Sequence, residues 1–101
     1  MEEGKYYKVE DSGGFWMIGI ALSNGRLDDD GYYRSKAQFI NKGCYNKNAD
    51  WSYGGNGQKR TYREATNEEI GWLEYCIEKN KYMSKESYLK QRPQQPIYEI
   101  Y

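Results

Sequence analysis

Hydrophobic residues between positions 63 and 79 recur at the spacing of one helix face. At about 100° per residue, these apolar side chains fall within an arc of roughly 160°, and the acidic side chains face the other way. The apolar set is Ile70, Trp72, Leu73, Cys76 and Ile77. Thr66 followed by Glu69 forms a capping box, in which each side chain accepts a hydrogen bond from the backbone amide of the other. The pattern predicts one amphipathic helix over residues 63–79, with Trp72 and Leu73 buried.

Before this helix, the pattern changes to short runs of strand-forming residues. Residues 15–22 are the most apolar window, and their length, β-branched content and flanking turns favour a central strand. Residues 5–10 and 32–40 also predict strands, although residues 35–39 would tolerate a short helical turn. Residues 58–64 form a polar alternating strand that leads directly into the helix.

Turn residues separate these runs. An Asp-Ser-Gly-Gly sequence at 11–14, an Asn-Gly pair at 24–25 and a Gly-rich stretch at 54–57 each supply residues that accept positive φ. Residues 44–53, which hold several Asn and Asp residues, predict an irregular loop that ends in a short edge strand. Gly19, inside the most apolar window, indicates a bulge or a place where another backbone comes close.

About five short strands followed by one C-terminal helix indicate a mainly β fold of the α+β class. We expect a small SH3-like or half-open antiparallel barrel capped by the amphipathic helix. A five-stranded barrel of the oligonucleotide-binding type is the nearest alternative, but its helix usually lies between strands. A chain of 101 residues is one domain by length. We assign residues 1–90 to it, with Ser84 and Ser87 capping one more helical turn, and residues 91–101 to an extended or disordered tail.

Composition and charge narrow the class of function. The 15 basic and 15 acidic residues cancel, which removes the strong field expected of a protein dedicated to duplex DNA. Cys44 and Cys76 lie far apart in a chain without His, so the usual zinc patterns are absent. We predict reduced thiols, no metal and no cofactor. With neither a signal peptide nor an apolar run long enough for a membrane span, we expect a soluble, intracellular protein.

No arrangement of residues indicates catalysis. The acidic run at 28–30 could suggest a calcium loop, but Phe39 stands where an EF-hand requires Glu, so a solvated acidic turn is favoured. The Gly-rich stretch at 54–57 lacks the order of a phosphate-binding loop. Cys76 has no His to activate it and is expected in the core. We therefore predict a protein that is not an enzyme, although a carboxylate pair acting alone stays an alternative.

Paired aromatic residues are the richer candidate for function. The pairs at 6–7, 15–16 and 32–33 each predict one inward and one outward ring, with Lys and Arg residues between them. Outward rings beside cations serve single-stranded nucleic-acid platforms and protein interfaces alike, or merely cover a small sheet. The zero net charge favours a protein partner, and the acidic run could meet a basic groove on that partner. The candidate binding residues are Tyr7, Trp16, Tyr33, Arg34, Asp28, Asp29 and Asp30.

Two segments of the chain resemble one group of known proteins. The matching patterns are Arg-Glu-Ala-Thr-x-Glu-Glu-Ile-x-Trp-Leu-x-x-Cys-Ile at 63–77, followed by Asn-Lys-Tyr-Met, and Gly-Lys-Tyr-Tyr-Lys at 4–8. They resemble segments of short, mostly uncharacterised proteins from phages and mobile elements of gut bacteria. The resemblance covers about a quarter of the 101 residues. It implies a phage or mobile-element origin, a small sheet-plus-helix fold and no catalytic residues.

These observations lead to one function hypothesis and two alternatives. We expect a phage-type accessory protein that binds a host or viral protein in the cytoplasm of the bacterial host, where it inhibits a defence system such as CRISPR. The first alternative is a module that binds single-stranded nucleic acid. The second is a structural or self-assembling component of the virion. The oligomeric state stays open.

Overall fold

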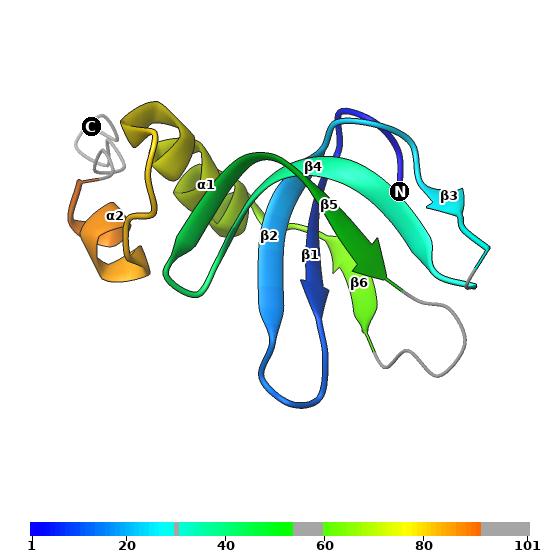
Figure 1. Ribbon diagram of the computed structural model, residues 1–101. Helices are drawn as coiled ribbons and strands as arrows, with labels where there is room; N and C mark the ends of the chain where they lie inside the picture. Colours follow the sequence, from blue (N-terminus) through cyan, green and yellow to red (C-terminus); the bar gives the residue numbers. More distant parts are fainter. Residues whose placement is uncertain (30, 54–59, 92–101) are drawn as a thin grey trace, which may run out of the picture.

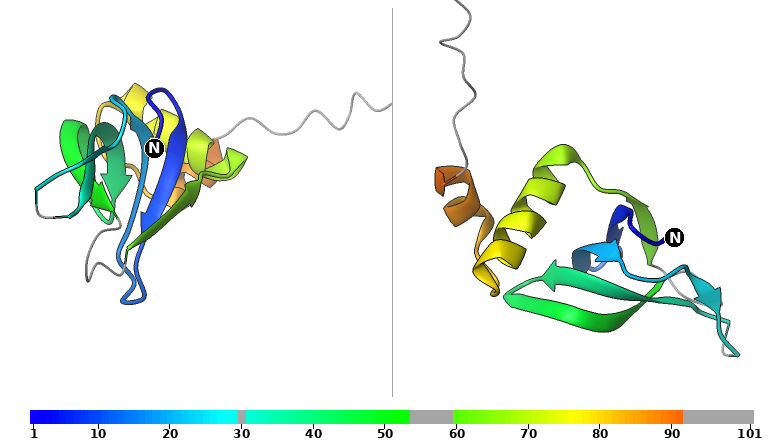
Figure 2. Two further views of the ribbon diagram at one scale, coloured as in Figure 1. Left: turned by 90° about the vertical axis from the view of Figure 1, so that its right-hand side faces the viewer. Right: turned by 90° about the horizontal axis from the view of Figure 1, so that it is seen from above.

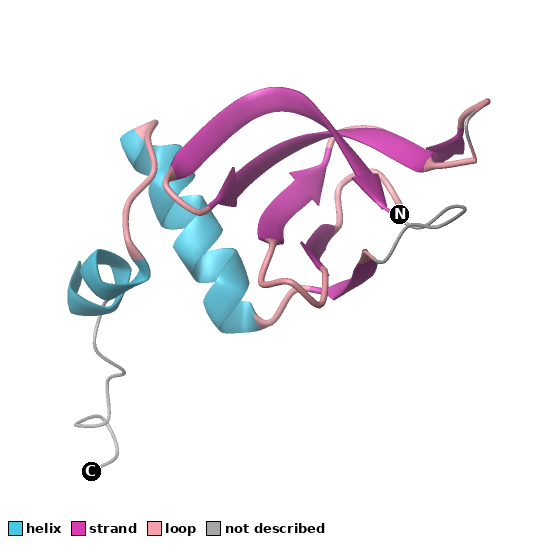
Figure 3. Ribbon diagram, turned by 60° about the horizontal axis from the view of Figure 1, so that its bottom comes forward, coloured by secondary structure: helices cyan, strands magenta, loops and turns pink. Residues whose placement is uncertain are grey.

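A computed structural model describes residues 1–29, 31–53 and 60–91 of the chain (Figure 1). The elements follow in this order: β1 (Tyr6–Glu10), β2 (Trp16–Ala21), β3 (Arg26–Leu27), β4 (Tyr33–Asn41), β5 (Cys44–Tyr53), β6 (Thr61–Glu64), α1 (Asn67–Lys79) and α2 (Lys85–Gln91). The predicted fold class is confirmed: the protein is mainly β, with a curled antiparallel sheet that forms a half-open barrel and with α1 lying along it (Figure 3).

The sheet is a meander whose last strand returns to the first. β2 pairs with β1 on one side and with β4 on the other, and β4 also pairs with β5 and with the short β3. β6 then pairs antiparallel with the free edge of β1. Each long strand thus lies beside the next long strand in the chain, and α1 follows the last strand.

β2 is buried on both of its faces. Met17 and Ala21 face the inside of the curl, in a cluster that we call the inner core: Tyr7, Val9, Met17, Ala21, Ala37, Phe39 and Trp51. Ile18 faces α1, in a second cluster that we call the helix core: Ile18, Ile40, Trp72, Leu73 and Cys76. Successive strand residues point to opposite faces, so a strand covered on both sides needs the continuous apolar run that the sequence shows here.

Gly19 marks a close approach between strands, as one of its two interpretations predicts. A Cβ at this position would lie 2.6 Å from the Cβ of Phe39 and 2.9 Å from the carbonyl oxygen of Gln38, both on β4. These distances are too short for any other residue without movement of the β4 backbone. The absence of a side chain at position 19 therefore lets β4 and the Trp51 ring pack against β2.

The predicted capping box at the start of α1 is confirmed. Thr66 Oγ1 accepts a hydrogen bond from the Glu69 amide at 3.1 Å, and Glu69 Oε1 accepts one from the Thr66 amide at 2.9 Å. The helix begins at Asn67, directly after the cap that the sequence predicts at Thr66. Arg63 belongs to β6, because the backbone stays extended until the cap at Thr66.

The buried face of α1 is the predicted one. Trp72, Leu73 and Cys76 are buried, and the Trp72 ring packs on Trp16 of β2 with 5.3 Å between ring centroids. The Trp72 indole N–H donates to the carbonyl oxygen of Met83 at 2.7 Å, which satisfies the buried donor. Aromatic packing and one directed hydrogen bond thus hold α1, and the segment that follows it, on the sheet.

The expectation for residues 44–53 is corrected. Residues 44–53 form the continuous strand β5 and not an irregular loop, because the whole segment pairs with β4. A bulge sets Ala37 opposite Ala49 but Phe39 opposite Asn46, so the extra residue is absorbed within the pairing. The further helical turn predicted from Ser84 and Ser87 is confirmed: Ser84 Oγ accepts the Ser87 amide at 3.0 Å at the start of α2. The turn predicted at 54–57 and the tail at 92–101 lie outside the described residues.

Glu69 joins the sheet to the helix electrostatically. Its carboxylate accepts two hydrogen bonds from the Arg63 guanidinium, each of 2.8 Å, in addition to the capping bond from Thr66. These contacts, with Arg63 the largest cause, lower the pKa of Glu69 from 4.5 to about 2. A depressed folded-state pKa means that ionised Glu69 stabilises the fold above pH 4.5, and that this stabilisation is lost as the pH falls toward 2.

We predict that Glu69→Gln lowers the free energy of unfolding at pH 7 by on the order of 1 kcal/mol, since it removes the charge that Arg63 binds. The difference from wild type should shrink as the pH falls from 4.5 to about 2. Urea unfolding at a series of pH values measures it, with Glu78→Gln on the exposed side of the same helix as the control. A difference that does not change with pH would show that the Arg63 contact does not depend on the charge of Glu69.

Candidate binding groove at the β3–β4 end

Tyr7 lies inside the curl and is not a surface ring. Only 6% of it is exposed, its ring meets the ring of Tyr62 edge to face, and its hydroxyl accepts the Glu2 amide at 3.0 Å. The prediction that Tyr7 faces outward is therefore wrong. Its neighbour Tyr6 faces the other side of the sheet, where it packs against the helix core and donates its hydroxyl to Glu74 at 2.6 Å.

Trp16 is also used in packing. It lies against Trp72 in the helix core, while the adjacent Phe15 packs against the inner core. Strand alternation does send the two rings of this pair to opposite faces, as expected. Both faces are covered at this point of the sheet, however, so neither ring of the pair points freely outward. The physical reason is the same as for Tyr7: a core lies on each side of β1 and β2.

The remaining predicted residues do come together, at the end of the molecule farthest from the helices. β3 pairs with the start of β4 to form a short projection that we call the β3–β4 ribbon: Arg26, Leu27, Tyr33 and Arg34. In Figures 1 and 2 this ribbon and the two helices occupy opposite ends of the fold. Tyr33, Arg34, Asp28 and Asp29 lie on or beside the ribbon, whereas Asp30 lies outside the described residues.

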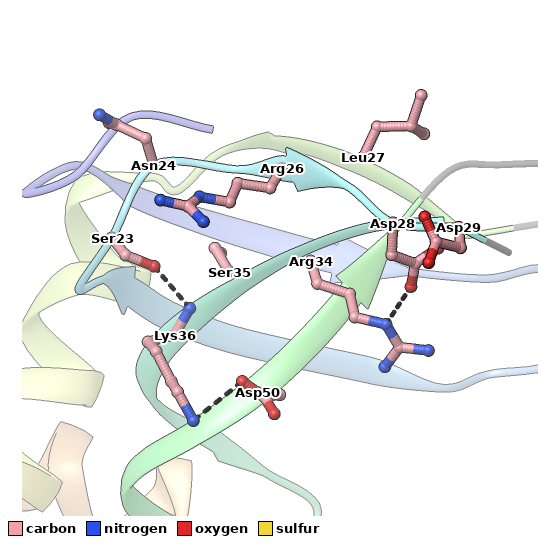
Figure 4. Close-up of a pocket in the computed structure, with 10 residues that line it drawn as sticks. All are labelled: Ser23, Asn24, Arg26, Leu27, Asp28, Asp29, Arg34, Ser35, Lys36 and Asp50. Atoms are coloured by element: carbon pink, nitrogen blue, oxygen red, sulfur yellow. Dashed lines mark hydrogen bonds and ion pairs between the residues drawn. The ribbon is translucent and has the colours of Figure 1, made fainter. Parts of the chain in front are cut away.

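An open groove of about 540 Å³ runs beside the ribbon (Figure 4). It is lined mainly by polar and charged side chains from β3, β4, β5 and the loops next to β3. The lining residues are Ser23, Asn24, Arg26, Leu27, Asp28, Asp29, Arg34, Ser35, Lys36 and Asp50. Three of them, Asp28, Asp29 and Arg34, are binding residues predicted from the sequence; Arg26 was not predicted, because only the strand register brings these residues together.

Asp28 organises the turn between β3 and β4. One carboxylate oxygen accepts the Tyr32 amide at 2.9 Å, and the other binds the Nε–H of Arg34. The backbone amide of Asp28 donates to the Tyr32 carbonyl at 2.8 Å, which closes the same turn. Both oxygens of Asp28 are thus engaged by its own chain, and its contact with a partner stays a prediction. Asp29 is exposed.

Cations and acids pair along the groove with one exception. Arg34 pairs with Asp28, and the Lys36 ammonium lies 3.1 Å from an oxygen of Asp50 on β5. Arg26, directly opposite Arg34 in the strand register, has no acidic partner within ion-pair distance in the described part of the chain. Among the described residues, Arg26 is therefore the groove cation without an ion-pair partner.

Leu27 and Tyr33 form an apolar pair on the ribbon. They face each other across β3 and β4, and their exposed fractions are 61% and 44%. Because side chains alternate along a strand, this pair points to the face opposite the Arg26–Arg34 pair. Two large apolar side chains exposed next to each other are typical of the centre of a contact surface. The sequence predicts Tyr33 as a binding residue but not Leu27, because no local pattern marks Leu27 as exposed.

The groove has the chemistry of a binding site. Residues 1–29, 31–53 and 60–91 contain no cluster of His, Cys, Asp and Glu that could hold a metal ion. Both cysteines are free thiols outside the groove, and burial raises the pKa of Cys76, which disfavours its thiolate. What the groove offers is a set of charged hydrogen-bonding groups and an adjacent apolar pair.

Comparison of the chain with models of protein families, with curated proteins and with solved structures finds no match. Within the described residues, neither helix is long and apolar enough to cross a membrane. The functional interpretation of this chain therefore depends on its own residues and their arrangement.

The two acids of the turn should respond differently to substitution. We predict that Asp28→Ala destabilises the protein by about 1 to 3 kcal/mol, because it removes the acceptor of the Tyr32 amide and the partner of Arg34. Asp29→Ala, the matched control, should change stability by less than about 0.5 kcal/mol. Urea unfolding of both variants measures this difference. Equal losses would contradict the structural role assigned to Asp28.

Proposed function

We propose that this protein is not an enzyme and acts by binding another protein through the β3–β4 ribbon. The observation that carries the proposal is the Leu27–Tyr33 pair, which exposes two large apolar side chains beside charged residues. Protein interfaces combine an apolar centre, often with Tyr, and a polar rim that excludes water and sets orientation. The Leu27–Tyr33 pair supplies an apolar centre, and exposed Asp29 at the end of the ribbon supplies a charged residue for the rim.

A protein partner is favoured over single-stranded nucleic acid. A stacking platform needs several exposed rings beside cations. Of the three predicted rings, Tyr7 is buried in the inner core and Trp16 packs, partly buried, against the helix core, whereas Tyr33 is 44% exposed. The cations near Tyr33 are interspersed with Asp28, Asp29 and Asp50, which weaken the attraction for a phosphate backbone.

The biological setting that we propose is the cytoplasm of a bacterial host. The resemblance of the capped helix and the opening strand to phage and mobile-element proteins supports an accessory role, and inhibition of a defence system such as CRISPR is the role we favour. Asp29, exposed beside the apolar pair, could meet a basic surface on a target that handles nucleic acid. In this role the protein would occupy a surface of its target and block the entry of substrate.

Affinity capture from host lysate tests this proposal with one pair of variants. We predict that the wild-type chain retains a specific protein and that Leu27→Ala/Tyr33→Ala weakens its retention at least tenfold, because truncation of such anchors costs about 2 kcal/mol or more. Leu89→Ala, which truncates an exposed apolar residue of α2, is the matched control and should retain the protein.

Three results would contradict the proposal. Equal retention by the double variant and the Leu89→Ala control would show that the ribbon is not the contact surface. Salt-sensitive binding of a single-stranded oligonucleotide that is lost in Tyr33→Ala would indicate nucleic-acid binding instead. A stable multimer on size exclusion, with no protein captured, would indicate a structural component of a virion.

A further inference from the structure

We propose that Arg26 receives a carboxylate group, from an Asp or Glu side chain of the partner protein, in the groove beside the ribbon. This inference rests on the proposed function, since it names the chemistry that the partner presents to the groove face of the ribbon. Arg26 lies on the groove face of the ribbon, whereas the Leu27–Tyr33 pair lies on the opposite face.

Two arginines of like charge lie across from each other in the ribbon. Arg26 and Arg34 lie directly opposite each other in the β3–β4 register. Like charges at such positions destabilise a strand pair unless an anion offsets them. Asp28 offsets the charge of Arg34, but no acidic side chain in the described part of the chain does so for Arg26. An anion bound at Arg26 would remove the repulsion that remains.

The Arg26 side chain is accessible to an incoming anion. It is exposed, and Figure 4 shows it extended toward Ser23 and Asn24, whereas Arg34 extends the opposite way toward Asp28. The side-chain ammonium of nearby Lys36 pairs with Asp50, and the backbone N–H of Lys36 donates to Ser23 Oγ at 2.9 Å. Arg26 is therefore the cation of the groove that an incoming anion can reach without breaking an existing ion pair.

The groove favours a carboxylate over a phosphate. The planar guanidinium forms two parallel hydrogen bonds with a carboxylate, and that geometry fixes the direction of approach. Asp28, Asp29 and Asp50 line the same groove and repel anions. A single negative charge on a carboxylate meets less of this repulsion than a doubly charged phosphate or a polyanionic strand. The groove thus favours an isolated acidic side chain on a protein surface.

A capped Ala-Glu-Ala peptide, which carries a single carboxylate, is a suitable probe, titrated into the full chain and followed by the NMR signals of arginine Nε–H groups and backbone amides. We expect a saturable shift of the Arg26 Nε–H signal and of the amides at 23–26. Arg26→Gln should weaken the peptide affinity at least tenfold. Lys42→Gln, which removes the same charge from the exposed turn between β4 and β5, should leave it unchanged.

A second variant tests whether the planar guanidinium, and not its charge alone, binds the carboxylate. Arg26→Lys retains the charge but lacks the planar fork, so its affinity for the peptide should fall between those of wild type and Arg26→Gln. Equal affinities of Arg26→Gln and Lys42→Gln would overturn the inference. So would displacement of the peptide by inorganic phosphate at lower concentrations than by acetate, because that result would indicate a phosphate site.

The outcome also separates this inference from the proposed function. If the captured protein is lost by Leu27→Ala/Tyr33→Ala but retained as well by Arg26→Gln as by wild type, the ribbon binds a protein and the role of Arg26 is wrong. If neither variant loses the captured protein, the proposed function fails. The inference fails with it, whatever the peptide shows, because the groove then has no protein partner to present the carboxylate.

Discussion

Burial of β2 on both faces is the constraint on which the rest of this structure depends. Met17 and Ala21 point into the inner core and Ile18 points into the helix core, so one strand joins two hydrophobic clusters. Neither cluster is large enough to be expected to hold a small domain alone, because small chains bury a limited share of their surface. The curl of the sheet, the absence of a side chain at Gly19 and the docking of α1 all serve to cover this strand.

The same constraint determines where a binding surface can lie. Covering β1 and β2 on both sides buries Tyr7 in the inner core and packs the partly buried Trp16 against the helix core. β3 has two residues, both exposed, and no core behind it. The ribbon can therefore present Leu27 and Tyr33 to a partner at little cost to the stability of the fold, since neither residue belongs to a core. Packing of the two cores thus leaves the side chains of the ribbon exposed.

Sequence patterns predicted the features that depend on residues close in the chain. The Thr66–Glu69 capping box and the apolar face of α1 lie within a few helical turns, and both were predicted correctly. Features that depend on pairing between distant segments were missed. The Asn-rich segment of β5 becomes a strand because β4 pairs with it along its length. Alternation predicted that the rings of each pair diverge, but not that both faces would be covered. The groove joins residues 23–29 to Arg34, Lys36 and Asp50, which only the strand register reveals.

Native-state hydrogen exchange tests most directly whether the two cores form one unit that excludes the ribbon. If they do, the slowest amides of β2, β4 and α1 exchange only through global unfolding, with the same free energy of opening. Amides of β3 exchange faster, through local opening that leaves both cores intact. Opening of α1 at a distinctly lower free energy than β2 would contradict the account. Protection of β3 equal to that of β2 would contradict it as well, because the ribbon would then belong to the core.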